Sequence, residues 1–166
     1  MDELGLRVLA AEISADLQVI QETAGLAKER FGLGSDAALE AAAYQLARCY
    51  NALEQMAARI ARGFENQTSD RTGWHVELIR RLSMAIPGVR PALFPPEIRA
   101  DLQELRGFRH VFHHAYDLIL DSSRLIPLLD AANRVATALP AAIQQFLSDV
   151  IQQEGWSSDE LRVTSK

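Results

Sequence analysis

The chain has 166 residues, of which 48% are hydrophobic and 23% are charged, a composition typical of one folded domain and unlike that of a disordered or fibrous protein. No stretch offers the roughly 18 uninterrupted apolar residues of a membrane span. The N-terminus lacks the basic and apolar regions of a signal peptide, so we expect a cytoplasmic protein. The net charge of −5 excludes a broad basic surface, and any contact with nucleic acid should therefore be local. The single cysteine, Cys49, excludes an internal disulfide and a multi-cysteine zinc site.

The first half of the chain predicts two long helices. The first covers residues 2–30 and ends at a Gly-Leu-Gly turn. The second covers residues 35–64, with Ser35 as its N-cap, and Cys49 should be a small buried residue within it. Apolar residues recur every three or four positions in both helices. In the first they are Leu6, Leu9, Ile13, Leu17 and Ile20, and in the second Leu39, Ala43, Leu46, Tyr50, Leu53, Ala57 and Ile60.

The second half predicts three more helices. A short one covers residues 72–86, and a proline-rich connector follows that should be extended. The fourth helix starts at Pro95 or Pro96 and runs to about Leu120. The fifth begins after Asp121 or Ser122, and Pro140 should kink it.

These elements define the expected architecture. Five helices with mostly short links predict an all-α fold, an antiparallel bundle of about five helices. We expect one domain over residues 1–154 and a polar C-terminal tail over 155–166.

The fourth predicted helix contains most of the candidate functional residues, including three of the four histidines. At about 100° per residue, one face is apolar and should be buried: Leu105, Phe108, Val111, Phe112, Ala115 and Ile119. The opposite face gathers ionisable side chains: Arg106, His110, His113, His114 and Asp117. Arg109 and Tyr116 lie at the boundary between the two faces.

Histidine and arginine on one face suit metal-free RNA cleavage. Imidazole accepts and donates protons near pH 7, and a guanidinium supports negative charge on phosphate. Two other interpretations remain. The face could simply be solvated, or His110, His113 and His114 could bind a metal, although the neighbouring arginines would repel a cation.

Several other residues have weaker claims on function. Trp74 and His75 should serve the core and the cap of the third helix. Arg80, Arg81 and Arg90 could help to guide RNA, but the default expectation is that they are ordinary surface charges.

The segment Arg109-x4-His114-x-Tyr116 resembles the R-x4-H-x-Y signature of HepT-type toxins, in the HEPN superfamily of all-α ribonucleases. Three flanking stretches are also similar to HepT-like proteins: residues 73–79, 86–91 and 105–110. The resemblance covers residues 72–125 well, and the rest of the chain shares only the helical pattern.

The resemblance implies a homodimeric, metal-independent endoribonuclease that needs no cofactor and is not bound to a membrane. Its targets include tRNA, and the catalytic pair would be Arg109 and His114. The partner would be an MNT-type nucleotidyltransferase antitoxin of a type VII-like toxin–antitoxin pair, which silences the toxin by AMPylation of Tyr116. Independently of the resemblance, the polar face of this helix offers Arg106, His110, His113 and Asp117 as possible accessory residues. Asp117 could orient a histidine or simply face solvent.

Helix geometry creates a conflict within this motif. His114 lies about 140° from Arg109 on an ideal helix, whereas His113 lies about 40° away. A dimer resolves the conflict if Arg109 of one subunit approaches His114 of the other, and His113 remains the second candidate. The competing hypothesis for function is a non-catalytic helical dimer that only binds a nucleotidyltransferase.

Overall fold

The computed structural model describes residues 1–65, 74–114 and 119–156, and these residues form an all-α fold without a β-strand. In chain order the elements are α1 (Glu3–Phe31), α2 (Asp36–Glu65), α3 (Trp74–Leu82), the 3-10 helix η1 (Pro96–Ile98), α4 (Arg99–His114) and α5 (Ser122–Glu154). The predicted fold class is confirmed. None of the helices in this part of the chain has the length and apolar character to cross a membrane.

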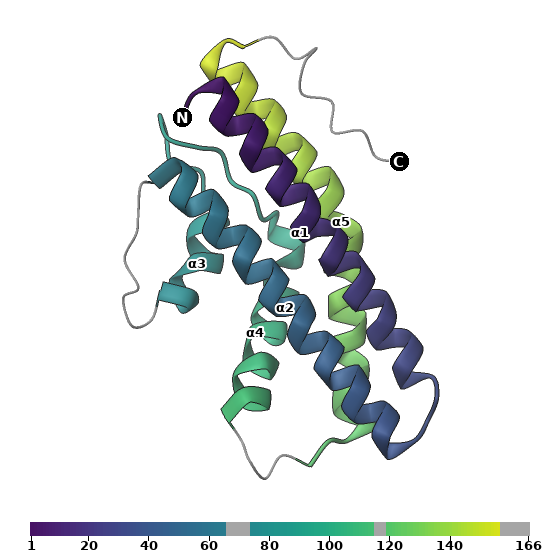
Figure 1. Ribbon diagram of the computed structural model, residues 1–166. Helices are drawn as coiled ribbons and strands as arrows, with labels where there is room; N and C mark the ends of the chain where they lie inside the picture. The colour runs from purple at the N-terminus through teal and green to yellow at the C-terminus, as the bar shows by residue number, and fades with distance from the viewer. Residues whose placement is uncertain (66–73, 115–118, 157–166) are drawn as a thin grey trace.

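Three long helices form the body of the bundle (Figure 1). The helix α1 runs antiparallel to both α2 and α5 and packs against both. The shorter helices α3 and α4 lie on the other side of α2, and α4 also contacts α5. The segment around His114 therefore projects from one side of the body.

Helix starts are fixed by short-range caps. The Asp2 carboxylate accepts a hydrogen bond from the Gly5 amide at 2.8 Å, and the Ser35 hydroxyl accepts one from the Ala38 amide at 3.2 Å. The Asp121 carboxylate accepts from the Ser123 amide at 2.8 Å. These caps satisfy amides that have no partner inside the helix. The starts predicted for the first, second and fifth helices are confirmed.

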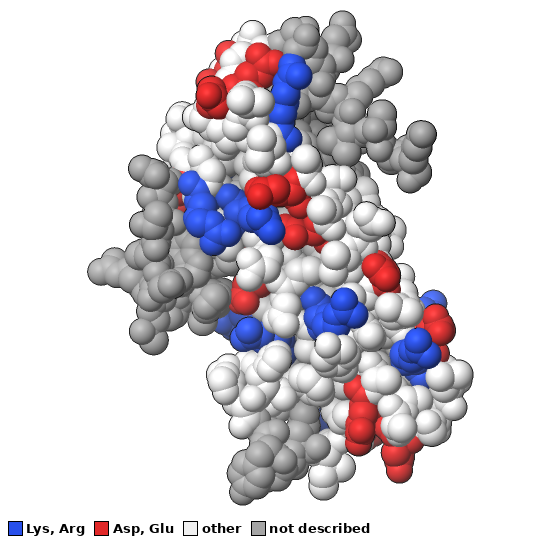
Figure 2. Space-filling view, in the orientation of Figure 1, with Lys and Arg blue, Asp and Glu red and all other residues white. Residues whose placement is uncertain are grey.

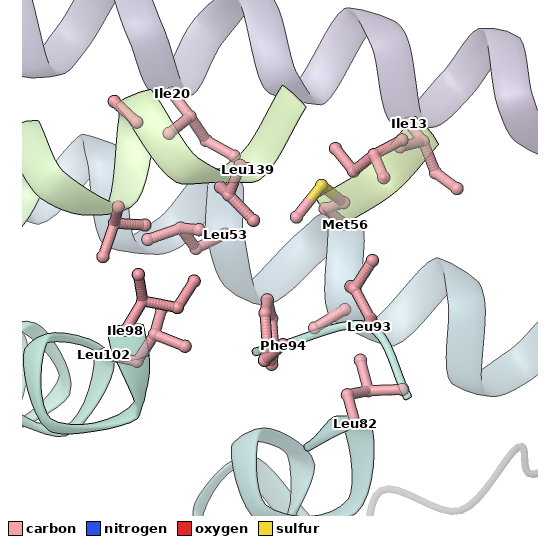
Figure 3. Packing of buried hydrophobic residues seen from close by; sticks show 14 of the residues in the cluster. Ile13, Ile20, Leu53, Met56, Leu82, Leu93, Phe94, Ile98, Leu102 and Leu139 are labelled. Atoms are coloured by element: carbon pink, nitrogen blue, oxygen red, sulfur yellow. The ribbon is translucent and has the colours of Figure 1, made fainter. Parts of the chain in front are cut away.

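One hydrophobic core joins all the helices. The apolar stripes predicted on α1 and α2 are buried, except for Leu17 and Leu39, which are half-buried. Figure 3 shows side chains of every helix and of the connector converging on this core. Cys49 is fully buried, as predicted. The labelled members of the cluster are Ile13, Ile20, Leu53, Met56, Leu82, Leu93, Phe94, Ile98, Leu102 and Leu139.

The third helix ends earlier than predicted because its last carbonyl is used by the connector. The Leu82 carbonyl accepts hydrogen bonds from the Leu93 amide at 2.8 Å and the Phe94 amide at 3.0 Å. The Ile86 amide instead donates to the Arg90 carbonyl at 2.8 Å. The end predicted at Ile86 is therefore wrong, since α3 stops at Leu82.

The connector forms a tight turn before it becomes extended. The Val89 amide donates to the Ile86 carbonyl at 2.9 Å, and Gly88 has φ of +73°. Proline followed by glycine at positive φ is the pattern of a type II turn. Beyond this turn Leu93 and Phe94 are buried, so the connector contributes to the core.

Arg90 is a structural residue, and the expectation that it is a surface charge is wrong. Its side chain is fully buried, and its Nε and Nη2 donate to Glu65 Oε1 at 2.9 and 2.6 Å. Its guanidinium also donates to the carbonyls of Arg81, Met84 and Pro91. Arg90 therefore fastens the connector to the end of α2.

The helix α5 continues through Pro127 and Pro140, and the kink expected at Pro140 stays a prediction. It ends at Glu154, where Gly155 adopts φ of +70° as the C-cap. Most of the predicted C-terminal tail, residues 157–166, lies outside the described residues.

Candidate functional site

The first half of α4 is fixed to the bundle by burial and by an ion pair. Leu102 and Leu105 are buried in the core. Asp101 accepts two hydrogen bonds from Arg134 of α5, at 3.0 Å from Nε and 2.6 Å from Nη2. This anchoring sets the direction in which the rest of α4 leaves the bundle.

The second half of α4 diverges from the body, and the apolar face predicted there is only partly buried (Figure 1). Phe108 and Phe112 are half-buried, and their rings stack with centroids 5.6 Å apart. Val111 is 45% exposed and Ile119 is 85% exposed, so their predicted burial is wrong. Val111 does lie on a helix, as predicted, but no other part of the described chain buries its side chain.

The helix α4 also ends before the predicted position. His114 is its last residue, while Ile119 and Leu120 are not helical and lead into the Asp121 cap of α5. Tyr116 and Asp117, the predicted modification site and one accessory candidate, lie outside the described residues. The side chains of Trp74 and His75 also lie outside the described part of the chain.

All three motif histidines are exposed near the end of α4. The rings of His110 and His114 lie with centroids 4.7 Å apart, tilted by 53°. The ring of His113 instead meets Phe112 edge-on, with centroids 5.9 Å apart. The structure therefore places the His114 ring beside that of His110, one helical turn away, and both rings are exposed to solvent.

Arg109 is held by α2. Its Nε donates a hydrogen bond to Asn51 Oδ1 at 3.0 Å, and its Nη2 lies 3.8 Å from Glu54 Oε2. The Arg109 side chain is 31% exposed and that of Glu54 is 11% exposed. The guanidinium thus lies at the junction of α2 and α4 with part of its surface open to solvent.

A second arginine lies at the same junction. Burial, and then the charge of Glu54, raise the pKa of the Tyr50 hydroxyl, while the charges of Arg106 and Arg109 oppose that rise. Both guanidinium groups are therefore within electrostatic reach of Tyr50. Arg106 is half-buried, and its Nε is buried without a hydrogen-bond partner among the described residues.

Asn51 and Glu54 were not predicted as site residues. Both belong to the helix that the sequence predicts over residues 35–64, but polar residues at the edge of a buried stripe are ordinary. Asn51 meets Arg109 across 58 positions of the sequence. The signal in the sequence that could have indicated them is weak: Asn51 and Glu54 are polar, three residues apart, and follow the apolar Tyr50 in an alanine-rich helix.

On the side of the molecule that Figure 2 shows, the described residues form no continuous basic patch. The lysine and arginine side chains on this side are dispersed among acidic and uncharged ones. Among the described residues, no group of three or more His, Cys, Asp or Glu side chains is arranged to hold a metal ion. The arrangement at α2 and α4 instead offers a half-exposed guanidinium and a nearby set of exposed imidazoles.

The comparison with known families places most of the chain in a described family. The model of a family described as "HepT-like protein" matches residues 41–150, about two thirds of the chain. This region contains Asn51, Glu54, Arg109 and His114. No curated protein and no solved structure gives a significant match.

Proposed function

The chain belongs to the HepT-like family of the HEPN superfamily, and on that premise we propose that it is a metal-independent endoribonuclease that acts as a toxin. The observation that carries the proposal is the state of Arg109. Its guanidinium is fixed by Asn51 yet 31% exposed, and exposed imidazoles follow it on the same helix. A phosphodiester needs such a cation at the point where its charge increases during cleavage.

The proposed reaction is a transesterification within the RNA. A base removes the proton of a ribose 2′-hydroxyl, the 2′-oxygen forms a bond to phosphorus, and the bond from phosphorus to the 5′-oxygen breaks. An imidazolium donates a proton to the departing oxygen. Arg109 supports the charge on the phosphate, and His114 is the first candidate for proton transfer. His110 and His113 are accessory candidates.

The active form in this proposal is a homodimer. Exposed apolar side chains near the motif, Val111, Ile119 and Ile126, would be covered by a second copy. Pairing through this face would bring His114 of one subunit toward Arg109 of the other. It would also remove apolar surface from water.

The proposed partner is a nucleotidyltransferase antitoxin, and tRNA is the proposed substrate. Tyr116 follows His114 by two positions, so AMP attached to its hydroxyl would add an anion close to the motif. That anion would compete with RNA for the arginines. AMPylation of Tyr116 would thus silence the ribonuclease.

The test is RNA cleavage by the purified chain in EDTA, with tRNA as substrate. We expect Arg109→Ala and His114→Ala each to lower the cleavage rate by at least about a hundredfold. The His113→Ala variant, measured in parallel, should remain active. Arg30→Ala is the matched control, because the Arg30 side chain is 43% exposed at the end of α1 and pairs with the adjacent Glu29.

Three results would contradict the proposal. Full cleavage by both the Arg109 and the His114 variants would remove the proposed catalytic pair. A folded wild-type chain that binds a nucleotidyltransferase but cuts no RNA would favour the non-catalytic alternative. Activity that disappears in EDTA and returns with zinc would favour a metal site.

A further inference from the structure

We propose that Asn51 of α2 is a positioning residue for Arg109, which orients the guanidinium for a phosphodiester without neutralising its charge; this inference rests on the proposed function. The side chain of Asn51 does not need to touch RNA for this role. It acts through the hydrogen bond that its Oδ1 accepts from Arg109 Nε at 3.0 Å.

The atoms involved determine which part of the guanidinium remains for a ligand. The bond to Asn51 uses Nε, the donor nearest the aliphatic part of the side chain. The two terminal nitrogens, Nη1 and Nη2, carry four further N–H groups that match the oxygens of a phosphate. The Arg109 side chain is 31% exposed, so solvent, and therefore a ligand, reaches part of it.

Arg109 differs in this respect from arginines that hold the fold together. Arg90 donates from both Nε and Nη2 to the Glu65 carboxylate, and Arg134 donates from the same two atoms to Asp101. Each of those guanidinium groups has a carboxylate as its acceptor. The Nε acceptor of Arg109 is a neutral amide, which orients the group. The Glu54 carboxylate stays 3.8 Å from Nη2 and compensates the positive charge less than a directly hydrogen-bonded carboxylate would.

Glu54 adds attraction without a direct hydrogen bond to Arg109. Its Oε2 lies 3.8 Å from Nη2, beyond ordinary hydrogen-bond length. The carboxylate is 11% exposed, and a charge in such a place attracts a guanidinium more strongly than one in water. Glu54 therefore keeps the guanidinium close to α2, and Asn51 sets its orientation.

The support for Asn51 is rigid because α2 is anchored on both sides of it. Tyr50 and Leu53 are each 2% exposed in the core. Asn51 itself is half-buried at the edge of this stripe. Loss of its amide would leave the core side chains in place while Arg109 gains rotational freedom.

The experiment measures RNA cleavage kinetics for Asn51→Leu and Asn51→Asp beside the wild type. Leucine has a similar size but accepts no hydrogen bond, so we expect kcat to fall about tenfold or more while KM changes little. Aspartate keeps the acceptor but forms an ion pair with Nε. We therefore expect KM for RNA to rise about tenfold, with kcat less affected than in Asn51→Leu.

Gln55→Leu is the matched control, because Gln55 is an exposed amide on the same helix and makes the same chemical change. It should cleave RNA like the wild type. The urea unfolding midpoint of each variant, compared with this control, shows whether a loss of activity reflects a loss of fold. Asn51→Asp is isosteric and keeps the test valid if Asn51→Leu does not fold.

The outcomes separate this inference from the function on which it rests. Wild-type kinetics in both Asn51 variants would overturn the inference, and an unchanged KM in Asn51→Asp would overturn the argument from charge. If the folded wild-type chain cuts no RNA, the proposed function itself fails. If Arg109→Ala is inactive and both Asn51 variants are fully active, only the positioning role fails.

Discussion

Burial changes the acid–base chemistry of neighbouring side chains in α2. Cys49 is fully buried, and its Sγ lies 3.7 Å from the Ile20 carbonyl as a weak donor. Burial raises the pKa of its thiol to about 11, and the Thr23 hydroxyl opposes the rise only in part. Tyr50 shows the same direction of change. Neither group ionises near neutral pH in the folded protein.

The protection of Cys49 gives a prediction about reactivity. The thiolate is the nucleophile, so iodoacetamide at pH 8 should label the folded chain far more slowly than the chain in urea. Mass spectrometry of samples quenched over time measures the two rates. Equal labelling of both forms would mean that the region between α1 and α2 opens readily.

The same shift makes stability depend on pH. The folded state binds the thiol proton more tightly than the unfolded state, whose thiol pKa should be near the ordinary value of about 9. The stabilisation is therefore complete below that value and is lost as the pH rises toward about 11. Tyr50 adds to the loss in the same direction.

Single-residue roles were predictable only where they follow from local spacing. Arg109 and His114 could be proposed from the signature and from the helix that carries them. Asn51 and Glu54 could not, because their relation to Arg109 depends on how α2 and α4 cross. Arg90 was misjudged for a similar reason, since its carboxylate partner lies 25 positions away.

At the scale of elements, helix starts were easier to predict than helix ends. Asp2, Ser35 and Asp121 cap their helices with side chains close in sequence. The end of α3 depends on the Leu82 carbonyl, which is taken by the connector amides of Leu93 and Phe94. A boundary set by such a tertiary contact leaves no periodic signal in the sequence.

The joint between α2 and the connector gives a prediction about stability. Arg90→Met removes one of the two arginines that pair with the buried Glu65 carboxylate, since Arg81 still pairs with its other oxygen. It also removes the donor to three backbone carbonyls, and we expect a loss of at least about 2 kcal/mol in the free energy of unfolding. Urea denaturation followed by circular dichroism measures this change. Arg80→Met is the control, because Arg80 is 63% exposed and its pair should contribute less than about 1 kcal/mol. Similar losses in both variants would contradict a structural role specific to Arg90.

At the scale of the whole molecule, the apolar side chains around the motif should mark the dimer interface. Val111→Glu introduces a charge on this face and should weaken self-association, as measured by sedimentation at several concentrations. Val8→Glu is the matched control, because Val8 is 54% exposed on α1 and Val111 is 45% exposed on α4. A dimer broken by the Val8 change alone would place the interface on α1.

Mixed dimers test whether one site is built from two subunits. A chain with Arg109→Ala and a chain with His114→Ala are each expected to be inactive. When they are unfolded together and refolded, a mixed dimer would hold one intact site, with Arg109 from one chain and His114 from the other. Recovered cleavage supports a shared site, whereas continued inactivity would place both groups of a working site in the same chain.

The attachment of Arg109 to a different helix also affects how relatives are recognised. A search for the signature examines only the α4 segment, where Arg109 and His114 stand at a fixed spacing. If Asn51 orients Arg109, a relative with leucine at that position would satisfy the search and still cut RNA poorly. Active and inactive members of the family would then differ at a position 58 residues before the arginine. Surveys of genomes for active members should therefore examine both segments.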